Sequence, residues 1–457
     1  MEADATRGRR RLCCRCCCGQ LVVLGVAAVV ALVVLTRWYG EYVRVARTLP
    51  SELAAARREG LALIPADLRR SPSVPPDQNA APIYRRIHAL FGALGTAERK
   101  REEDVRQALR GGAASPKTLG LAARLLSDRA PILRLARQAA RLQHCDFERP
   151  YEQGPNLLLT EPGSLRRLAQ LLAIEAQLAS AEGRVADAFE AIHVGGRVAR
   201  HVAEEPILIS CLVSIAIDAI MDRAFQGVVL GHKNDPRIVA LATTAERSLR
   251  PAPDFGRALS GEVVCCRIMG DILRRERPDH LGVGSALPWF AAHTRARAAM
   301  VDAWEARSVA YWRAIFSALH AHEGDLMAQH RACEPITAEA MRNDGKRTYE
   351  MGALMMPVFA QAILKVAGNE AQRGLRAALV DLVSYRQKHG DWPATLADLP
   401  SRPPDDLFSG RPFIYRRTSE GFVLYSVGEN LKDDGGRARD PATKRVIDFV
   451  VSYPIGV

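Results

Sequence analysis

An apolar run near the N-terminus constrains this chain more than any other feature. Residues 21–35 read LVVLGVAAVVALVVL and contain no polar side chain. As a helix, the slightly longer stretch from Gly19 to Thr36 measures about 27 Å, close to the roughly 30 Å hydrocarbon thickness of a bilayer. The run therefore predicts a transmembrane anchor over residues 19–37.

The residues on either side of the run predict its orientation. Five arginines lie within residues 1–18, where only Glu2 and Asp4 carry negative charge. By the positive-inside rule, this short tail stays in the cytoplasm and the bulk of the chain is exported. Trp38 and Tyr39 follow the run, where amphipathic rings suit the far membrane interface. The expected location is the inner (cytoplasmic) membrane, with one span in contact with lipid.

Two other interpretations of the run stay open. A cleaved signal peptide shares the charged front and the apolar middle, although no small-residue cleavage pattern follows Thr36. A core helix of a soluble protein can be equally apolar, but it does not need five arginines in front of it. No second span is predicted, because Ser210, Ser214 and Asp218 interrupt the next most apolar segment.

The composition favours helix over strand. Alanine, leucine and arginine are abundant, and they lose little conformational entropy in a helix, whereas aromatic residues make up only 6%. Five of the ten cysteines cluster between positions 13 and 18, where they are either sites for acylation or soft metals, or small apolar residues at the helix entrance. The other five have no regular spacing, so no disulfide framework is predicted.

Proline and apolar periodicity divide the exported part. A stalk and Pro-rich linker is expected over residues 38–82, because dense proline prevents long helices. Residues 83–370 carry the i, i+3/i+4 apolar rhythm of amphipathic helices and predict an irregular array of helical hairpins. One hairpin is expected to have Ser164 as a helix N-cap and to turn near Gly183.

The last part of the chain, residues 371–457, changes character. A helix with an apolar stripe is expected to end at Gly390, a residue suited to a helix C-cap. Strands are expected over residues 413–416, 422–426 and 446–453, the first two forming a hairpin. The predicted fold class is mainly α, with an N-terminal transmembrane helix, a helical-hairpin domain and a small C-terminal α+β module with a short antiparallel sheet.

The order of motifs in this module resembles the globular region of the type II secretion major pseudopilin. The resemblance covers about residues 375–450 and includes an acidic Gly-rich loop, which binds calcium in that family. The segments that carry it are Asp391-Trp392-Pro393, Asp406-Leu407-Phe408-Ser409-Gly410-Arg411-Pro412, Tyr425-Ser426-Val427-Gly428 and Asp433-Asp434-Gly435-Gly436. It implies an envelope module related to secretion.

The chain departs from the pseudopilin pattern in two ways. Its apolar run lacks the assembly glutamate, and well over half of the chain separates the run from the module. The whole layout, with a segment Asn79-Ala80-Ala81-Pro82-Ile83-Tyr84 ahead of the helical hairpins, resembles uncharacterised bacterial families of single-anchor helical membrane proteins. The resemblance therefore implies a module and not a filament subunit.

Calcium is the one cofactor that the resemblance suggests. Asp433, Asp434 and Asp440 supply carboxylate oxygens in a glycine-rich loop, and a hard cation prefers such ligands. The competing interpretation is a solvated acidic loop, in which Asp-Asp-Gly-Gly is turn chemistry. Lys432, Arg437 and Arg439 would oppose a bound cation.

No catalytic motif is apparent. The stretch HAHEGDLMAQH has Leu326 where a zinc protease motif starting at His322 would need its second histidine, so it predicts a polar helix surface. Phosphate-binding loops and nucleophile elbows are absent from the sequence. Cys145 follows His144, but sequence neighbours rarely form a nucleophile–base pair. Acidic pairs such as Glu204-Glu205 are expected on solvated helix surfaces or helix ends.

The basic charge of +12 does not predict nucleic-acid binding. Arg99-Lys100-Arg101 lies between Glu98 and Glu102-Glu103, which indicates a salt-bridged helix face. Export makes anionic lipid headgroups or acidic wall polymers the more suitable partners.

Three functional hypotheses follow. The first is a membrane-anchored envelope protein that binds protein partners or acts as a scaffold and catalyses no reaction of its own. The second is an envelope hydrolase that uses dispersed carboxylates, and the third is a component of a secretion system. The sequence favours the first, because it offers an anchor and a helical body but no catalytic motif.

Overall fold

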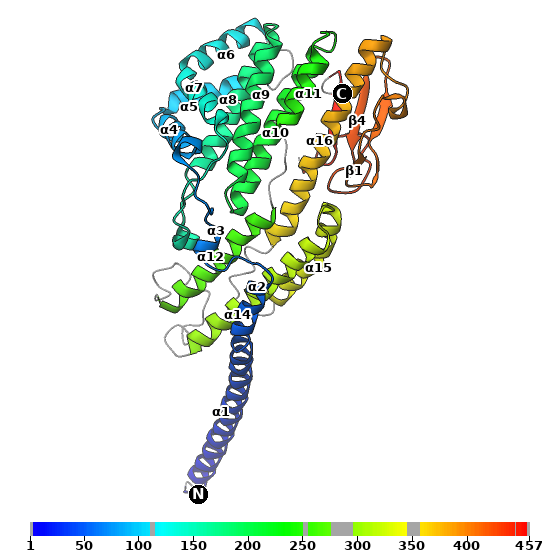
Figure 1. Cartoon of the computed structure of the whole chain (residues 1–457). Coiled ribbons are helices and arrows are strands. Elements are labelled where there is room, and N and C mark those ends of the chain that lie inside the picture. The colour runs from blue at the N-terminus through cyan, green and yellow to red at the C-terminus, as the bar shows by residue number, and fades with distance from the viewer. Residues whose placement is uncertain are drawn as a thin grey trace.

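The computed structural model describes residues 3–109, 115–249, 255–275, 296–344, 357–443 and 445–454. Within these ranges the chain is mainly helical and ends in two small antiparallel sheets. Figure 1 shows one long helix, α1, projecting from an elongated helical body. The predicted fold class is confirmed.

Helix α1 (Ala3–Ala46) contains the apolar run. The large apolar side chains between Val23 and Leu35 are 47–68% exposed, so this segment is not a core helix of the described structure. Thr36, the first polar residue after the run, satisfies its hydroxyl by donating to the carbonyl oxygen of Leu32 at 2.9 Å. By length and composition α1 is able to cross a membrane, and no other helix in the described ranges meets those criteria.

The remaining helices build the body in chain order. They are α2 (Leu49–Arg58), α3 (Pro65–Leu68), α4 (Ala81–Gly92), α5 (Thr96–Leu109), α6 (Pro116–Asp128), α7 (Ala130–Arg141), α8 (Glu161–Ala181), α9 (Val185–Ala203), α10 (Leu208–Gly231), α11 (Ile238–Ser248), α12 (Phe255–Arg275), α14 (Ala296–Ala321), α15 (Leu326–Asp344) and α16 (Pro357–His389). Short 3₁₀ turns are η1 (Pro76–Gln78), η2 (Tyr151–Asn156) and η5 (Leu396–Asp398). The loop expected between Pro278 and Pro288 lies outside the described residues.

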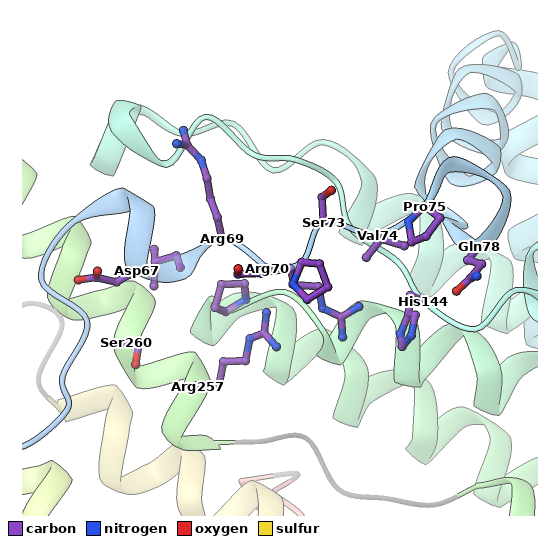
Figure 2. Close-up of a pocket in the computed structure, with 14 residues that line it drawn as sticks. Asp67, Arg69, Arg70, Ser73, Val74, Pro75, Gln78, His144, Arg257 and Ser260 are labelled. Atoms are coloured by element: carbon purple, nitrogen blue, oxygen red, sulfur yellow. The ribbon is translucent and has the colours of Figure 1, made fainter.

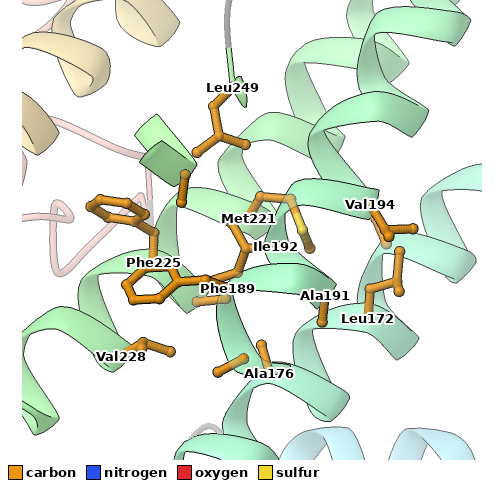
Figure 3. Close-up of a cluster of buried hydrophobic side chains, with 14 of the residues drawn as sticks. Leu172, Ala176, Phe189, Ala191, Ile192, Val194, Met221, Phe225, Val228 and Leu249 are labelled. Atoms are coloured by element: carbon orange, nitrogen blue, oxygen red, sulfur yellow. The ribbon is translucent and has the colours of Figure 1, made fainter. Parts of the chain in front are cut away.

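The largest hydrophobic core lies where α8, α9 and α10 pack together. Figure 3 shows Phe189 of α9 beside Phe225 of α10, and the two rings meet edge to face with centroids 5.8 Å apart. Gly195 lets α10 approach α9, because a Cβ there would lie 2.0 Å from the sulfur of Met221. The apolar segment that the sequence predicts as a central helix is therefore the centre of the core.

The helical hairpin expected around Gly183 is confirmed, because α8 ends at Ala181 and α9 begins at Val185. Gly183 has φ +75°, a conformation that glycine adopts without steric cost. The predicted N-cap is wrong: Thr160 is the N-cap and α8 begins at Glu161, four residues earlier than expected. Ser164 lies inside the first turn, and its hydroxyl is 2.8 Å from Nδ1 of His88 instead.

A second apolar cluster joins α2, α12, α14 and α16 nearer to α1. Trp312 of α14 packs edge to face on Phe359 of α16, with centroids 5.4 Å apart, and Phe359 also contacts Phe255 of α12. Leu61 and Leu63 from the Pro-rich segment belong to the same cluster. This segment was expected to be a linker between the anchor and the helical domain. These contacts show that it packs against the body.

The C-terminal strands form the predicted hairpin. A three-stranded sheet has the order β3 (Ile414–Arg417), β4 (Phe422–Ser426), β5 (Phe449–Tyr453), and a two-stranded sheet pairs β1 (Asp405–Asp406) with β2 (Arg411–Pro412). The larger sheet packs on α16, which runs without a break across the predicted boundary between residues 370 and 371. Gly390 follows this helix with φ +82° and donates to the carbonyl oxygen of Arg386, as expected of a C-cap.

Residues of the pseudopilin-like motifs hold this module together. Asp406 is buried and accepts a hydrogen bond from the hydroxyl of Ser426 at 2.7 Å, which joins β1 to the end of β4. Trp392 is buried with its ring 4.7 Å from that of Phe422. Tyr415 donates to the carbonyl oxygen of Pro393 at 2.9 Å. The contacts of these side chains stabilise the fold of the module, which accounts for the presence of these residues without a ligand.

A buried polar cluster lies between α10 and α16. Arg376 of α16 forms an ion pair with Asp222 of α10, and the two side chains are 1% and 0% exposed. One turn earlier on α10, Asp218 accepts a hydrogen bond from Asn369 at 3.1 Å. Two helices far apart in sequence are therefore joined through charges that are removed from water.

Asp218 makes stability depend on pH. Burial raises the pKa of Asp218 to about 6, against the opposing effects of Asn369, Arg376 and Arg373. Since the folded state then binds more protons than the unfolded state between about pH 4 and pH 6, stability falls as the pH rises through this window. Relative to Asp218→Asn, the free energy of unfolding of the natural chain is expected to drop by on the order of 3 kcal/mol from pH 4 to pH 7.

Urea titrations of the two proteins at several pH values measure this difference. Asp128→Asn is the matched control, because Asp128 lies on α6 with a side chain that is 51% exposed. A difference between natural chain and Asp218→Asn that does not change with pH would contradict the prediction.

Candidate functional site

Two adjoining cavities lie between the Pro-rich segment, the loop after α7 and the start of α12. Their volumes are about 650 Å³ and about 430 Å³, and both are lined by Arg70, Pro206 and Arg257. Volumes of this size are typical of sites for small ligands. We call the two cavities together the arginine cleft. The polar residues that line its larger part are Asp67, Arg69, Arg70, Ser71, Ser73, Gln78, His144, Arg257 and Ser260.

The motif Asn79-Ala80-Ala81-Pro82-Ile83-Tyr84 fixes one wall of the cleft. The side chain of Asn79 accepts from the backbone N–H of Asp146 at 2.9 Å and donates to the carbonyl oxygen of Asp146 at 2.9 Å. Ala80 donates its backbone N–H to His144, so the two segments run side by side like paired strands. The asparagine therefore ties the Pro-rich segment to the loop after α7.

The tyrosine of the same motif is anchored in the core. Tyr84 is fully buried, and its hydroxyl lies 2.8 Å from Nδ1 of His201 on α9. His201 Nε2 lies 3.1 Å from the carbonyl oxygen of Leu142, so a neutral ring that accepts from Tyr84 and donates to Leu142 satisfies both contacts. Burial lowers the pKa of His201 to about 3, which keeps this ring neutral.

A buried ion cluster forms the floor of the smaller cavity. Arg149 contacts Glu205 at 2.5 Å and Glu161 at 2.8 Å, and all three side chains are less than 10% exposed. Ser210 donates its hydroxyl to the other oxygen of Glu205. The ring of Phe147 lies 4.4 Å from the guanidinium of Arg149 and covers it.

The neighbouring Glu204 joins three segments at the cleft. It forms an ion pair with Arg70 at 2.9 Å, accepts from the backbone N–H of Cys145 at 3.1 Å and lies 3.6 Å from Nδ1 of His144. Of the two placements expected for Glu204-Glu205, the structure shows the helix end, directly after α9, and not a solvated helix surface. Both carboxylates are turned inward because arginines from distant segments meet them there.

Cys145 lacks the surroundings of a nucleophile. Its side chain is buried, and burial together with the charges of Glu204 and Glu205 raises the pKa of the thiol well above its ordinary value. A reactive cysteine requires the opposite, a lowered pKa near positive charge. The adjacent His144 faces Glu204 and not the thiol.

Helix α12 forms the opposite wall and carries Arg257. Gly261 lets α12 pass directly over the chain before α10, because a Cβ there would lie 1.8 Å from the carbonyl oxygen of Pro206. Glu262 is buried and accepts from the backbone N–H of Leu208, at the start of α10, at 3.2 Å. Burial raises the pKa of this carboxyl above its ordinary value. These contacts fix the position of Arg257.

The larger cavity is basic. Its lining contains three arginines and one aspartate, and Asp67 accepts from the backbone N–H groups of Leu63 and Ile64. Figure 2 shows Arg257 reaching from α12 toward the segment that carries Arg70, whereas Arg69 points away from α12. The serines that line this cavity add hydroxyl donors, so its chemistry suits an anion.

The backbone at the cleft is strained at one position. Glu148 has φ +50°, a conformation that is unfavourable for a residue with a side chain, and it lines the smaller cavity. Asp146 supports this turn by accepting from the backbone N–H of Glu148 at 2.8 Å. Strain of this kind is common in loops that bind ligands.

The three predicted calcium ligands are spread along the C-terminal loop. Asp433 accepts from the hydroxyl of Tyr425 at 2.7 Å, Asp434 from the amide of Asn430 at 2.6 Å, and Asp440 from the backbone N–H of Ala442 at 2.8 Å. Among the described residues, no three such side chains are grouped as metal ligands would be. Calcium binding stays a prediction from the resemblance.

The histidines of HAHEGDLMAQH lie at the turn between α14 and α15. His320 Nδ1 contacts the carbonyl oxygen of Phe316 at 2.9 Å, and His330 Nδ1 lies 3.2 Å from that of Ala360. The segment was predicted to be a polar helix surface, whereas a turn with Gly324 at φ +85° interrupts it.

The arginine cleft could not be predicted from the sequence. Its arginines come from a Pro-rich segment and from α12, and nothing in their spacing shows that they meet. One signal was present, since Arg69-Arg70 followed by Ser-Pro-Ser places charge and hydroxyls on a segment that proline keeps extended.

Comparison with known proteins finds no matching protein family, no matching curated protein and no matching solved structure. The resemblance of the C-terminal module to pseudopilins stays a prediction from its motifs.

Proposed function

We propose that this protein is a single-pass, membrane-anchored binding protein whose arginine cleft holds an anionic ligand with phosphate or carboxylate groups. The observation that carries the proposal is the lining of the larger cavity, about 650 Å³, in which Arg70, Arg257 and three serines lie with a single aspartate. Arg69 also borders this cavity, but it points away from α12 and pairs with Glu152. Guanidinium groups bind phosphate and carboxylate through charge-assisted hydrogen bonds. A space of this size suits a ligand as large as a disaccharide.

The anchor determines where the proposed binding site would lie in the cell. The exposed apolar segment of α1 would hold the cleft at a membrane surface, and the arginine-rich tail in front of it favours an exported body. Anionic ligands of the cell envelope are then within reach of the cleft.

The alternative of a hydrolase with dispersed carboxylates is less well supported by the geometry. The two glutamates that reach the cleft from the end of α9 are both held in ion pairs, Glu204 with Arg70 and Glu205 with Arg149. A general acid or base needs a free path to substrate at suitable distance. Their contacts instead make these carboxylates part of the wall.

Calorimetric titration of the detergent-solubilised full chain tests the cleft. Pyrophosphate and digalacturonate are the anionic probes, and maltose is a neutral probe of disaccharide size. At least one anionic probe is expected to bind, whereas maltose is not. Arg257→Gln is expected to weaken anion binding by about tenfold or more, because a lost charged hydrogen bond is worth about 1.5–3 kcal/mol.

Arg69→Gln is the matched control, since Arg69 lies in the same cleft wall but points away from α12. It is expected to leave the affinity nearly unchanged. Equal binding of maltose and the anions, or equal effects of the two variants, would contradict the proposal. Breakdown of digalacturonate during the titration would favour the hydrolase instead.

A further inference from the structure

The helical body has a basic end where it meets the anchor. Tyr42 of α1 is buried against Met300 and Ala303 of α14, and Trp38 packs beside it with its ring 4.9 Å from that of Tyr42. Arg307 of α14 lies over the same tyrosine ring, 5.6 Å from its centroid. Helix α14 therefore starts alongside α1 just beyond the apolar run, as Figure 1 shows.

Ion pairs fix the direction of α14 relative to the anchor. Arg307 pairs with Glu41 of α1 at 3.6 Å, and two turns further on Arg313 pairs with Glu52 of α2 at 2.6 Å. Helix α14 thus rises in the same direction as α1 and α2. Its first turn, which holds Arg297, is consequently its end nearest to the apolar run.

The end of α12 lies at the same level. Arg274 pairs with Asp302 of α14 at 2.8 Å and also contacts Glu305, and Arg297 donates to the carbonyl oxygen of Leu273. Because these contacts join the last turn of α12 to the first turns of α14, both helix ends face the anchor together. Arg275 is exposed on this end.

The rise of α1 gives the height of this end above the bilayer. Tyr42 lies seven residues beyond Leu35, about 10 Å along the helix, and Arg297 lies one turn closer to the apolar run than Met300 does. The headgroup layer extends roughly 5–8 Å beyond the hydrocarbon. Long arginine side chains at this height reach headgroups.

Among the described residues, the exposed unpaired charges at this end are positive. We call Arg37, Arg44 and Arg275 the membrane-proximal arginines; all three are exposed, and none has a carboxylate partner within the described ranges. Asp271, an exposed acidic residue one turn before Arg275, is paired with Arg274, and the partly exposed Asp302 and Glu41 are paired with Arg274 and Arg307. A surface with unpaired arginines attracts a negatively charged one.

We propose that this end of the body is a docking surface for anionic lipid headgroups. The proposal rests on the membrane anchoring proposed above and goes beyond it, because a single anchoring helix alone leaves the body free to tilt. Headgroup contacts at Arg44 and Arg275, which lie on different helices, hold the body upright and fix the height of the arginine cleft. Each such arginine near a negative membrane adds about 1 kcal/mol of attraction, or roughly fivefold in affinity.

Amide hydrogen exchange of the full chain in lipid nanodiscs tests this docking. The discs contain either phosphatidylcholine alone or phosphatidylcholine with about one third phosphatidylglycerol. Exchange in the last turn of α12 and the first turn of α14 is expected to slow severalfold in the anionic discs. High salt is expected to reverse the slowing, because it screens exposed charges.

Two double variants distinguish an effect of the membrane-proximal arginines from a general effect of the positive charge of the chain. Arg44→Gln with Arg275→Gln is expected to remove the slowing, whereas Arg86→Gln with Arg124→Gln, two exposed arginines on α4 and α6 at the far end of the body, is expected to keep it. Equal exchange in both kinds of disc overturns the docking surface while leaving the anchor intact. Failure of the chain to enter either disc overturns the anchor and, with it, the docking.

Discussion

Replacing Arg376 by methionine is expected to lower the free energy of unfolding by about 3–5 kcal/mol. The change leaves the carboxylate of Asp222, which is 0% exposed, without its counter-ion between α10 and α16. Burial already lowers the pKa of Arg376 to about 10, which shows how strongly this position disfavours charge. Denaturant unfolding of the detergent-solubilised full chain, followed by circular dichroism, measures the loss.

The expected loss of stability comes from the carboxylate that is left unpaired and not from the lost arginine side chain. Replacing both partners, with Arg376→Met and Asp222→Leu in one chain, is therefore expected to recover most of the stability, because a buried pair replaced by apolar residues is often neutral. Arg184→Met provides the control, since Arg184 pairs with Asp187 at 2.6 Å on a surface where it is 50% exposed. That variant is expected to lose under about 1 kcal/mol. A double variant as unstable as the single one would contradict this explanation.

Elements with a strong local pattern could be predicted from the sequence. The apolar rhythm of α8 and α9 and the glycine between them predicted the hairpin, because one stripe of each helix must be buried. Thr418 to Gly421 between two β-rich runs predicted the pairing of β3 with β4. The exposed apolar side chains of α1 agree with a helix that is made for lipid.

Features that depend on distant partners could not be predicted. The Pro-rich segment was expected to be a linker because proline excludes long helices, but whether Leu61 and Leu63 are buried depends on α12 and α14. Glu204 and Glu205 were expected on a solvated helix surface or at a helix end, and their ion pairs could not be predicted, because only the fold brings Arg70 and Arg149 to them. The arginine cleft belongs to this class, because three segments must meet before it exists.

Helix α15 lies within the range predicted to be helical, although its local sequence is unfavourable. Pro335 lies inside it, and a proline in a polar segment argues against a helix when only the sequence is considered. Buried Cys333 and Met327 pack against α16 and neighbouring elements, and this packing offsets the unfavourable proline. Tertiary contact decided the outcome against local propensity.

Gly261→Ala is expected to damage both the fold and the cleft. The added Cβ would lie 1.8 Å from the carbonyl oxygen of Pro206, so α12 has to move away from the start of α10. Overpacking of this kind costs about 1–3 kcal/mol, and more where backbone meets backbone. Since Ser260 and Arg257 lie on the same helix and line the cleft, the affinity for the anionic probe is expected to fall by about tenfold or more.

Gly120→Ala is the matched control for this prediction. Gly120 also lies within a helix, α6, but no atom lies within 4 Å of its added Cβ, so the substitution is expected to stabilise the chain by about 0.5–1 kcal/mol. The same Gly→Ala change is thus expected to lower the stability at Gly261 and to raise it at Gly120. Close packing against the backbone decides the effect at the first site, and helix propensity decides it at the second. Thermal unfolding and the calorimetric titration measure both effects. Gly261→Ala with unchanged anion affinity would show that the cleft does not depend on the approach of α12 to Pro206.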